Sequence, residues 1–177
     1  MDQNTIDEED VSPASMIPKS IFTWNESNIA SNTKVDFDNV NFQQGNFRYA
    51  RSNETFDSGR HSFKVKIEQI IGQSKDVSIG VCWNPNQTMD CGVYYFSESH
   101  IYCSYYPTIT NGHSQIFNQP PKMVEGDIME VIFDYDLKTI EFIINDVSIL
   151  NTEFKASGEV FIMAGMFGGT LQIIKIT

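Results

Sequence analysis

Short runs of alternating apolar and polar residues recur along most of this chain, and no stretch keeps a helical period. The runs span residues 63–67, 77–81, 128–133, 140–144, 160–166 and 171–176. Because successive side chains of a strand point to opposite faces, a period of two predicts a strand with a buried face for each run. Turn-forming Asn, Asp, Pro and Gly residues separate the runs. This spacing predicts an all-β sandwich or barrel.

The apolar side of these runs predicts the core, and the first residues predict a tail. The candidate core residues are Phe63, Val65, Val81, Val131, Phe133 and Phe142. A chain of 177 residues is long enough for one domain with a substantial core. Residues 1–19 are acidic, polar and interrupted by two prolines, so we predict a flexible, dispensable tail followed by one domain over residues 20–177.

Charge limits the partners that suit this chain. The formal net charge is -11, from 23 acidic and 12 basic residues. A field of this sign repels duplex nucleic acid and anionic membranes. We therefore expect a basic or neutral protein or peptide partner rather than nucleic acid, a membrane or a small molecule. The alternative is that the acidity serves solubility alone.

Cysteine usage and the lack of a secretory leader indicate an intracellular, cytoplasmic protein. The three cysteines are too few and odd in number for a disulfide framework. Cys91, His100, Cys103 and His113 match no usual zinc spacing, so we expect no metal and no cofactor. There is no phosphate-binding glycine loop and no nucleophile elbow, so we expect no catalytic residues.

Five segments, taken in order, resemble the SPRY domain family. Residues 58–67 (SGRHSFKVKI) are similar to the family's SGxHYWEV opening, and residues 79–83 (IGVCW) to its xGV strand. Residues 126–134 (GDIMEVIFD) resemble GDxxGVxxD, and residues 139–146 (TIEFIIND) resemble TLSFxxNG. The closing segment, residues 154–169, resembles AF…LYPAVxxxxG. Glu130 and Asp146 depart from the family's small residue and turn glycine, which affects the expected turn geometry.

The resemblance implies both a fold and a function. The fold would be a two-sheet antiparallel β-sandwich of the concanavalin A-like jelly-roll type. The function would be non-catalytic recognition of a peptide or protein surface through rim loops. Such a module can be a substrate-recognition adaptor, as in ubiquitin ligation, or a scaffold subunit. The alternative is a carbohydrate-binding or glycoside-hydrolysing β-sandwich, because exposed aromatic residues also stack on sugars.

The resemblance also indicates candidate partner-binding residues in three segments. Residues 49–55 are interpreted as a loop that grips a peptide, and residues 167–168 as an aromatic residue beside a glycine. Tyrosines between residues 94 and 106 supply exposed anchors, although most of them could instead belong to the core. The predicted binding residues are Arg51, Ser52, Asn53, Glu54, Tyr94, Tyr95, Tyr105, Tyr106, Phe167 and Gly168. We expect Arg51, Asn53, Tyr95 and Phe167 to gather on one rim, with Arg51 outside the core.

Overall fold

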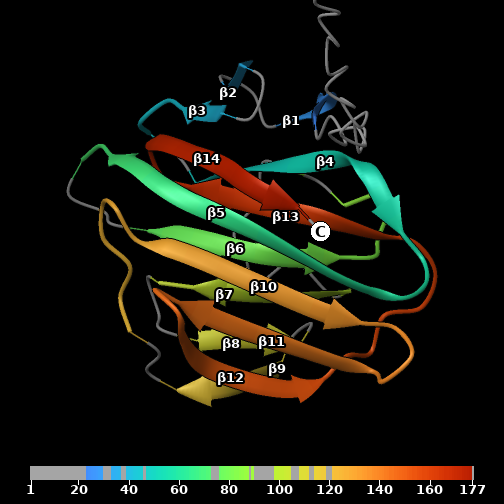
Figure 1. The fold of residues 1–177 in the computed structure, drawn as a ribbon. Coiled ribbons are helices and arrows are strands. Elements are labelled where there is room, and N and C mark those ends of the chain that lie inside the picture. Colours follow the sequence, from blue (N-terminus) through green and yellow to red (C-terminus); the bar gives the residue numbers. More distant parts are fainter. Residues whose placement is uncertain are drawn as a thin grey trace, which may run out of the picture.

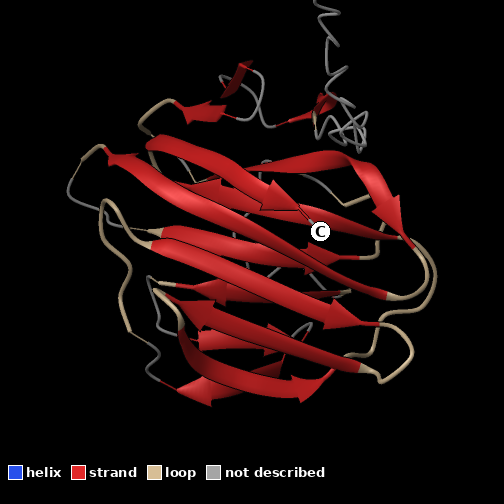
Figure 2. Cartoon of the chain, viewed as in Figure 1, coloured by secondary structure: helices blue, strands red, loops and turns tan. Residues whose placement is uncertain are grey.

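The chain forms a sandwich of two antiparallel sheets. The computed structural model describes residues 23–29, 33–36, 39–45, 47–72, 76–87, 89, 98–104, 108–111, 114–118 and 121–176. Every regular element in these residues is a strand (Figures 1 and 2). No helix in this part of the chain is long and apolar enough to cross a bilayer. The expected all-β, two-sheet fold is therefore confirmed.

Within the described residues, each sheet has seven strands. The first sheet has the spatial order β1 (Trp24–Ile29), β4 (Arg48–Phe56), β13 (Val160–Met166), β6 (Val77–Cys82), β7 (Ser99–Cys103), β8 (Thr108–Asn111), β9 (Ser114–Asn118). The second has the order β12 (Val147–Glu153), β11 (Thr139–Ile144), β10 (Ile128–Asp134), β5 (Arg60–Ile70), β14 (Gly169–Ile176), β3 (Asn39–Phe42), β2 (Thr33–Asp36). β13 lies between β4 and β6 in the first sheet, and β14 lies between β5 and β3 in the second, so each sheet is completed only when one of these two C-terminal strands is in place.

The core between the sheets matches the alternating pattern of the sequence. All six predicted runs lie in strands, and all six predicted core residues are fully buried. The register sets Val131 directly between Phe63 and Phe142, so these three side chains form one row across β5, β10 and β11. This row belongs to the main apolar cluster, which fills the space between the sheets.

The turn between β11 and β12 accommodates the departure at Asp146. Asn145 and Asp146 both have positive φ, 48° and 64°, as a two-residue type I′ turn requires. Asn145 stabilises the turn through its side chain, which accepts a hydrogen bond from the Ile128 amide at 2.9 Å and donates one to Asp127 at 2.8 Å. The turn therefore forms although aspartate stands where the family has glycine.

A second apolar cluster covers the outer face of the first sheet. Every residue of β6 and β13 is buried, so these strands are covered on both faces. The outer cluster contains Tyr49, Cys82, Met89, Ile101, Cys103, Phe161 and Met163. Gly165 makes room for it, because a Cβ atom there would lie 2.5 Å from the ring of Tyr49.

Candidate functional site

Residues 49–55 form a strand, so the prediction that they form a loop is wrong. They belong to β4, which pairs with β1 on one side and β13 on the other. Their polar sequence led to the loop interpretation, but neighbouring strands satisfy the polar groups. Arg51 and Ser52 are 5% and 0% exposed, so the expectation that Arg51 lies outside the core is also wrong.

Ser52 supports an irregularity in the pairing of β4 with β13. The register shifts between Phe161 and Met163, where β4 carries extra residues. The Ser52 hydroxyl accepts a hydrogen bond from the Ile162 amide at 3.0 Å and donates one to the Glu54 carbonyl at 2.7 Å. A side-chain oxygen thus takes the place of a ladder carbonyl, which gives Ser52 a structural role.

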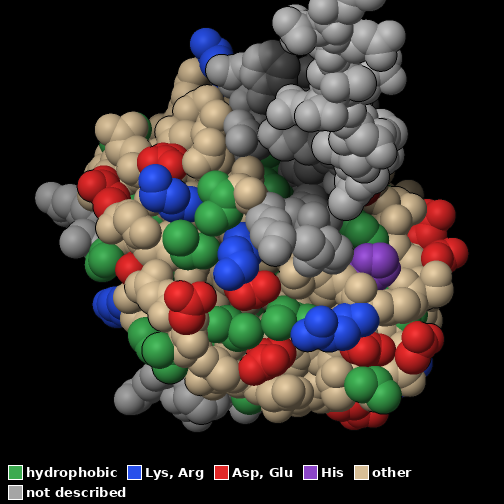
Figure 3. All heavy atoms as spheres, in the orientation of Figure 1, with side chains coloured by type: hydrophobic (Ala, Val, Ile, Leu, Met, Phe, Trp, Pro, Cys, Tyr) green, Lys and Arg blue, Asp and Glu red, His purple; other side chains and the backbone are tan. Residues whose placement is uncertain are grey.

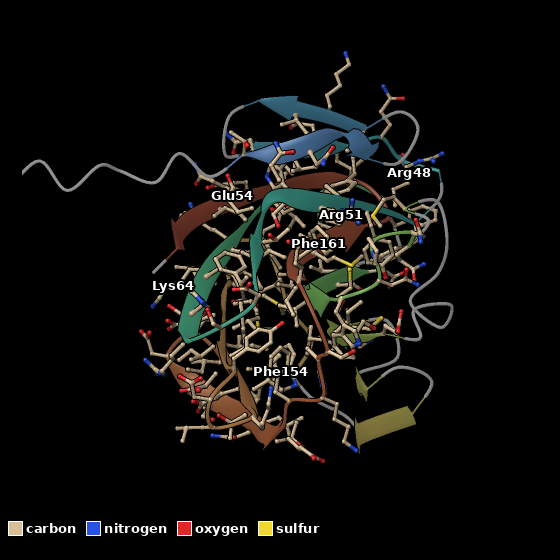
Figure 4. All side chains as sticks on the ribbon, turned by 90° about the vertical axis from the view of Figure 1, so that its right-hand side faces the viewer. Arg48, Arg51, Glu54, Lys64, Phe154 and Phe161 are labelled. Carbon is tan, nitrogen blue, oxygen red and sulfur yellow. The ribbon has the colours of Figure 1, made fainter. Side chains whose placement is uncertain are left out.

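Arg51 crosses the outer cluster and holds a turn against β4. Its Cζ atom lies 4.1 Å from the centre of the Phe161 ring, and its Nη1 donates to the Pro85 carbonyl at 2.8 Å (Figure 4). The Arg51 Nε atom is buried and has no hydrogen-bond partner among the described residues. The guanidinium therefore interacts with a ring and a carbonyl rather than with the carboxylate that a solvated loop would supply.

Asn53 and Glu54 connect β4 to the start of the described chain. The Asn53 side chain donates to the Thr23 hydroxyl at 2.8 Å. The Glu54 carboxylate accepts from the Thr23 amide at 3.1 Å. The next residue, Trp24, is 1% exposed. These two predicted site residues thus hold β1 at the edge of the first sheet.

Phe167 and Gly168 lie at one end of the sandwich, on the left in Figure 1. They form the turn between β13 and β14, where the Ile71 amide donates to the Gly168 carbonyl at 2.9 Å. Arg51 pairs with Met163, four residues before Phe167 and therefore about 10 Å or more from this turn. The expectation that Arg51 and Phe167 share one rim is wrong, because Arg51 lies in mid-strand.

The end of the sandwich that contains Phe167 has a concentration of exposed aliphatic residues. Ile71, Val124 and Val147 are 40%, 48% and 65% exposed, and they are three of the five exposed large hydrophobic residues in the described chain. We call Ile71, Val124, Val147 and Phe167 the Phe167 rim. The sequence interpretation missed the first three. The sequence feature that could have identified them is their position within two residues of the turn residues Gly72, Gly126 and Asp146.

Hydrogen bonds connect the segments of the Phe167 rim. The Ile70 amide donates to Glu125 at 2.8 Å, and the Val124 amide donates to Asp127 at 2.7 Å. Asp127 also accepts from the Asn145 side chain, which links this segment to the turn before Val147. The acidic groups here thus position backbone as well as carrying charge.

The four predicted tyrosines, Tyr94, Tyr95, Tyr105 and Tyr106, lie outside the described residues. Ser104, which precedes two of them in the sequence, lies at the same end of the sandwich as Phe167. Its hydroxyl accepts from the Val77 amide at 2.8 Å, and the adjacent Asp76 carbonyl accepts from the Phe167 amide at 3.3 Å. The binding role of all ten predicted residues stays a prediction.

The described residues hold little reactive chemistry. No three His, Cys, Asp or Glu side chains within them gather as metal ligands do, while Cys91 and His113 lie outside them. Burial raises the pKa of Cys82 to about 12, which keeps the thiol protonated at neutral pH. Burial lowers the pKa of His100 to about 4, and its Nε2 accepts a hydrogen bond from the Lys155 amide at 3.3 Å. These groups are suited to packing.

Comparison with known proteins gives one family and one fold. A family model described as the SPRY domain matches residues 60–175. In sequence, no curated protein matches the chain.

Solved structures with the same fold share little sequence with this chain. The SPRY domain of human HERC1 is 16% identical with a TM-score of 0.73, over 86% of this chain and 97% of that one. The TRIM65 PSpry domain is 12% identical with a TM-score of 0.67, over 87% and 92%. A human SPRY domain is 16% identical with a TM-score of 0.62, over 80% and 94%. At these identities, the likeness establishes the sandwich fold alone.

Proposed function

This chain belongs to the SPRY domain family, and from that membership we propose that it is a non-catalytic module that binds a protein or peptide at the Phe167 rim. SPRY domains are generally protein-interaction modules, so the family sets the class of function. The proposal adds a location on the molecule. It also selects among the predicted residues: Phe167 and Gly168 lie at this rim, whereas Arg51, Ser52, Asn53 and Glu54 support the fold around β4.

The observation that carries the proposal is the concentration of exposed aliphatic residues at one end of the sandwich. Exposed apolar residues that gather in one place mark interaction sites, whereas single ones are ordinary. Ile71, Val124 and Val147 come from three segments that are distant in sequence, and the fold brings them to the same end. Covering each of these half-exposed side chains contributes about 1 kcal/mol to binding.

The rim is also suited to binding because its backbone is already held in place. Backbone amides donate hydrogen bonds to Glu125, Asp127 and the Gly168 carbonyl, and these bonds fix the segments that carry the aliphatic residues. A preorganised surface loses little conformational entropy when a partner docks. We extend the proposal to an adaptor or scaffold subunit in the cytoplasm, because the family's rim would recruit one protein while other surfaces remain available.

Site-directed photo-crosslinking tests the location. A photo-crosslinking amino acid replaces Ile71 in one variant and Leu137 in the other. Leu137 is the matched control, because it is 73% exposed and lies at the opposite end of the sandwich, on the right in Figure 1. We expect the partner to be captured from cells at position 71 and not at position 137. Capture at 137 alone would contradict the proposal.

Calorimetry with the captured partner then tests the chemistry. Val124→Asp places a charge among the aliphatic residues and should weaken binding about tenfold or more. Leu137→Asp adds the same charge elsewhere and should leave affinity unchanged. Equal affinity of both folded variants would show that the partner uses another surface. A glycan array tests the carbohydrate alternative, and we expect no signal on it.

A further inference from the structure

β12 forms one edge of the second sheet. Among the described strands, β11 is its only neighbour in the sheet, so one row of its backbone N–H and C=O groups faces away from β11. No other described strand pairs with this side. An edge of this kind is a template for an additional strand. β12 lies along the lower border of the sandwich in Figure 1, away from most of the Phe167 rim.

The sequence of β12 favours strand pairing. Its first six residues, VSILNT, carry no charge and no proline. Val, Ile and Thr also have high β propensity. Natural edge strands are commonly blocked by lysine, proline or a β-bulge. β12 has no lysine or proline, and its pairing with β11 is irregular at a single place, between Phe142 and Ile143. Its single charged residue is Glu153, at the end of the strand.

The charges beside this edge are mainly acidic. Asp146 precedes β12, and Glu141 lies on β11 with its carboxylate 2.6 Å from the Ser148 hydroxyl. Glu153 pairs with Lys155 at 3.3 Å, and Lys64 is shared between Glu130 at 3.0 Å and Asp146 at 3.9 Å. The four carboxylates and two lysines leave two negative charges. Figure 3 shows acidic side chains scattered over the lower part of this face, where Figure 1 places β10 to β12.

We propose that β12 binds an extended segment of another protein as an additional antiparallel strand, and that this segment carries Lys or Arg among β-branched residues. Backbone hydrogen bonds along the edge supply the pairing, and the basic residues complement Asp146 and Glu141. The site overlaps the proposed partner site only at Val147, the first residue of β12, and it rests on the backbone edge rather than on exposed aliphatic side chains. It therefore goes beyond that proposal and does not depend on it.

A second copy of this chain is a poorer occupant of the edge. Antiparallel pairing of two β12 strands about Leu150 would set Glu153 opposite Val147 of the other copy, next to Asp146. Like charges in such positions are destabilising. Each copy also carries a net charge of -11, which opposes association. A basic segment experiences attraction at the same positions.

Two synthetic peptides of equal length test the inference. They are acetyl-KVTVKVTVK-amide and acetyl-EVTVEVTVE-amide, which differ only in the charged residue. We expect the lysine peptide to slow hydrogen exchange of the amides in residues 147–153 and to bind about tenfold more tightly than the glutamate peptide. Exchange protection elsewhere, equal binding, or no binding of either peptide at millimolar concentration would overturn the proposal.

Variants of Asn151 connect the binding to the edge itself. Asn151 is an exposed residue in the middle of β12, so Asn151→Lys adds a positive charge without disturbing the core. We expect Asn151→Lys to weaken binding of the lysine peptide several-fold, and the control Asn151→Gln to leave it unchanged. Sedimentation that finds a wild-type dimer, lost in Asn151→Lys, would assign the edge to a second copy instead and overturn the proposal.

Discussion

At the scale of single residues, the polar side chains of β4 form hydrogen bonds with backbone groups that would otherwise lack a partner inside the protein. The Ser52 hydroxyl accepts one hydrogen bond and donates another at the point where the ladder between β4 and β13 is interrupted. Arg51 reaches across Phe161 to a carbonyl of the next turn. Buried polar groups that remain unpaired are costly, so these contacts explain why a buried strand keeps a polar sequence.

Ser52→Ala should lower the free energy of unfolding by about 1–3 kcal/mol, because the Ile162 amide would remain buried without an acceptor. Chemical denaturation measures the change. Ser148→Ala is the control: Ser148 is exposed, and its loss should cost less than about 0.5 kcal/mol. A Ser52→Ala variant as stable as the wild type would show that the irregularity in β4 is satisfied in another way.

At the scale of elements, the alternation of apolar and polar residues predicted the strands that bury one face. It did not predict strands whose polar side chains are paired through tertiary contacts. The pattern of β10 and β11 follows the period of two, and both strands were predicted within one residue at their ends. β4 was missed because its polar residues are satisfied by Ile162, Pro85 and Thr23, which are distant in sequence. Partners that are distant in sequence leave no pattern in the local sequence. The outer apolar cluster was missed for the same reason.

The hairpin between β11 and β12 offers a stabilising substitution. Asp146 has a φ of 64°, a left-handed conformation that costs less for glycine than for aspartate. Asp146→Gly should therefore raise the free energy of unfolding by about 0.5 kcal/mol, with the higher entropy of glycine in the unfolded chain limiting the gain. The control Asp146→Asn removes the charge and keeps a side chain of similar size, so it separates the effect of charge from the effect of backbone conformation. We expect it to change the free energy of unfolding little. A loss of stability in Asp146→Gly would mean that the side chain stabilises the turn.

At the scale of the whole molecule, the sandwich depends on segments from both ends of the chain. The fold class followed from the spacing of the runs, because many short alternating segments allow few other architectures. The position of the exposed rim did not follow, since Ile71, Val124 and Val147 come to the same end of the sandwich only through the topology of the second sheet. Sequence reasoning therefore predicted the scaffold better than the surface that it presents.

Truncation at the N-terminus should reveal where the domain begins. Deleting residues 1–19 should leave the thermal midpoint unchanged, because these residues are polar, acidic and interrupted by proline. Deleting residues 1–25 also removes Trp24, which is 1% exposed in the core, and should cost about 3–5 kcal/mol. Scanning calorimetry of both truncations checks the boundary. A large fall in the midpoint for the shorter deletion would place the start of the domain earlier.

The stability of the whole sandwich should also depend on pH through His100. This residue connects the two sheets, because it lies on β7 while its ring packs against Trp83 and Phe154 and its Nε2 accepts from the Lys155 amide. Burial, and secondarily the charge of Lys155, lowers the pKa of His100 from 6.5 to about 4. Between these values the unfolded chain binds a proton that the folded protein does not.

Stability from this residue is therefore complete above about pH 6.5 and falls as the pH drops toward 4. The slope should be about 1.4 kcal/mol per pH unit, with a total loss of about 3 kcal/mol. Protonation also removes the acceptor for the Lys155 amide, so acid unfolding of the sandwich should begin at the connection between β12 and β13. His100→Gln keeps an acceptor but does not titrate, and subtracting its stability profile removes the contribution of the carboxylates. The difference in unfolding free energy between wild type and His100→Gln could instead stay constant from pH 7 to 4. His100 would then bind a proton as readily in the folded protein as in the unfolded chain, and other contacts would hold the connection.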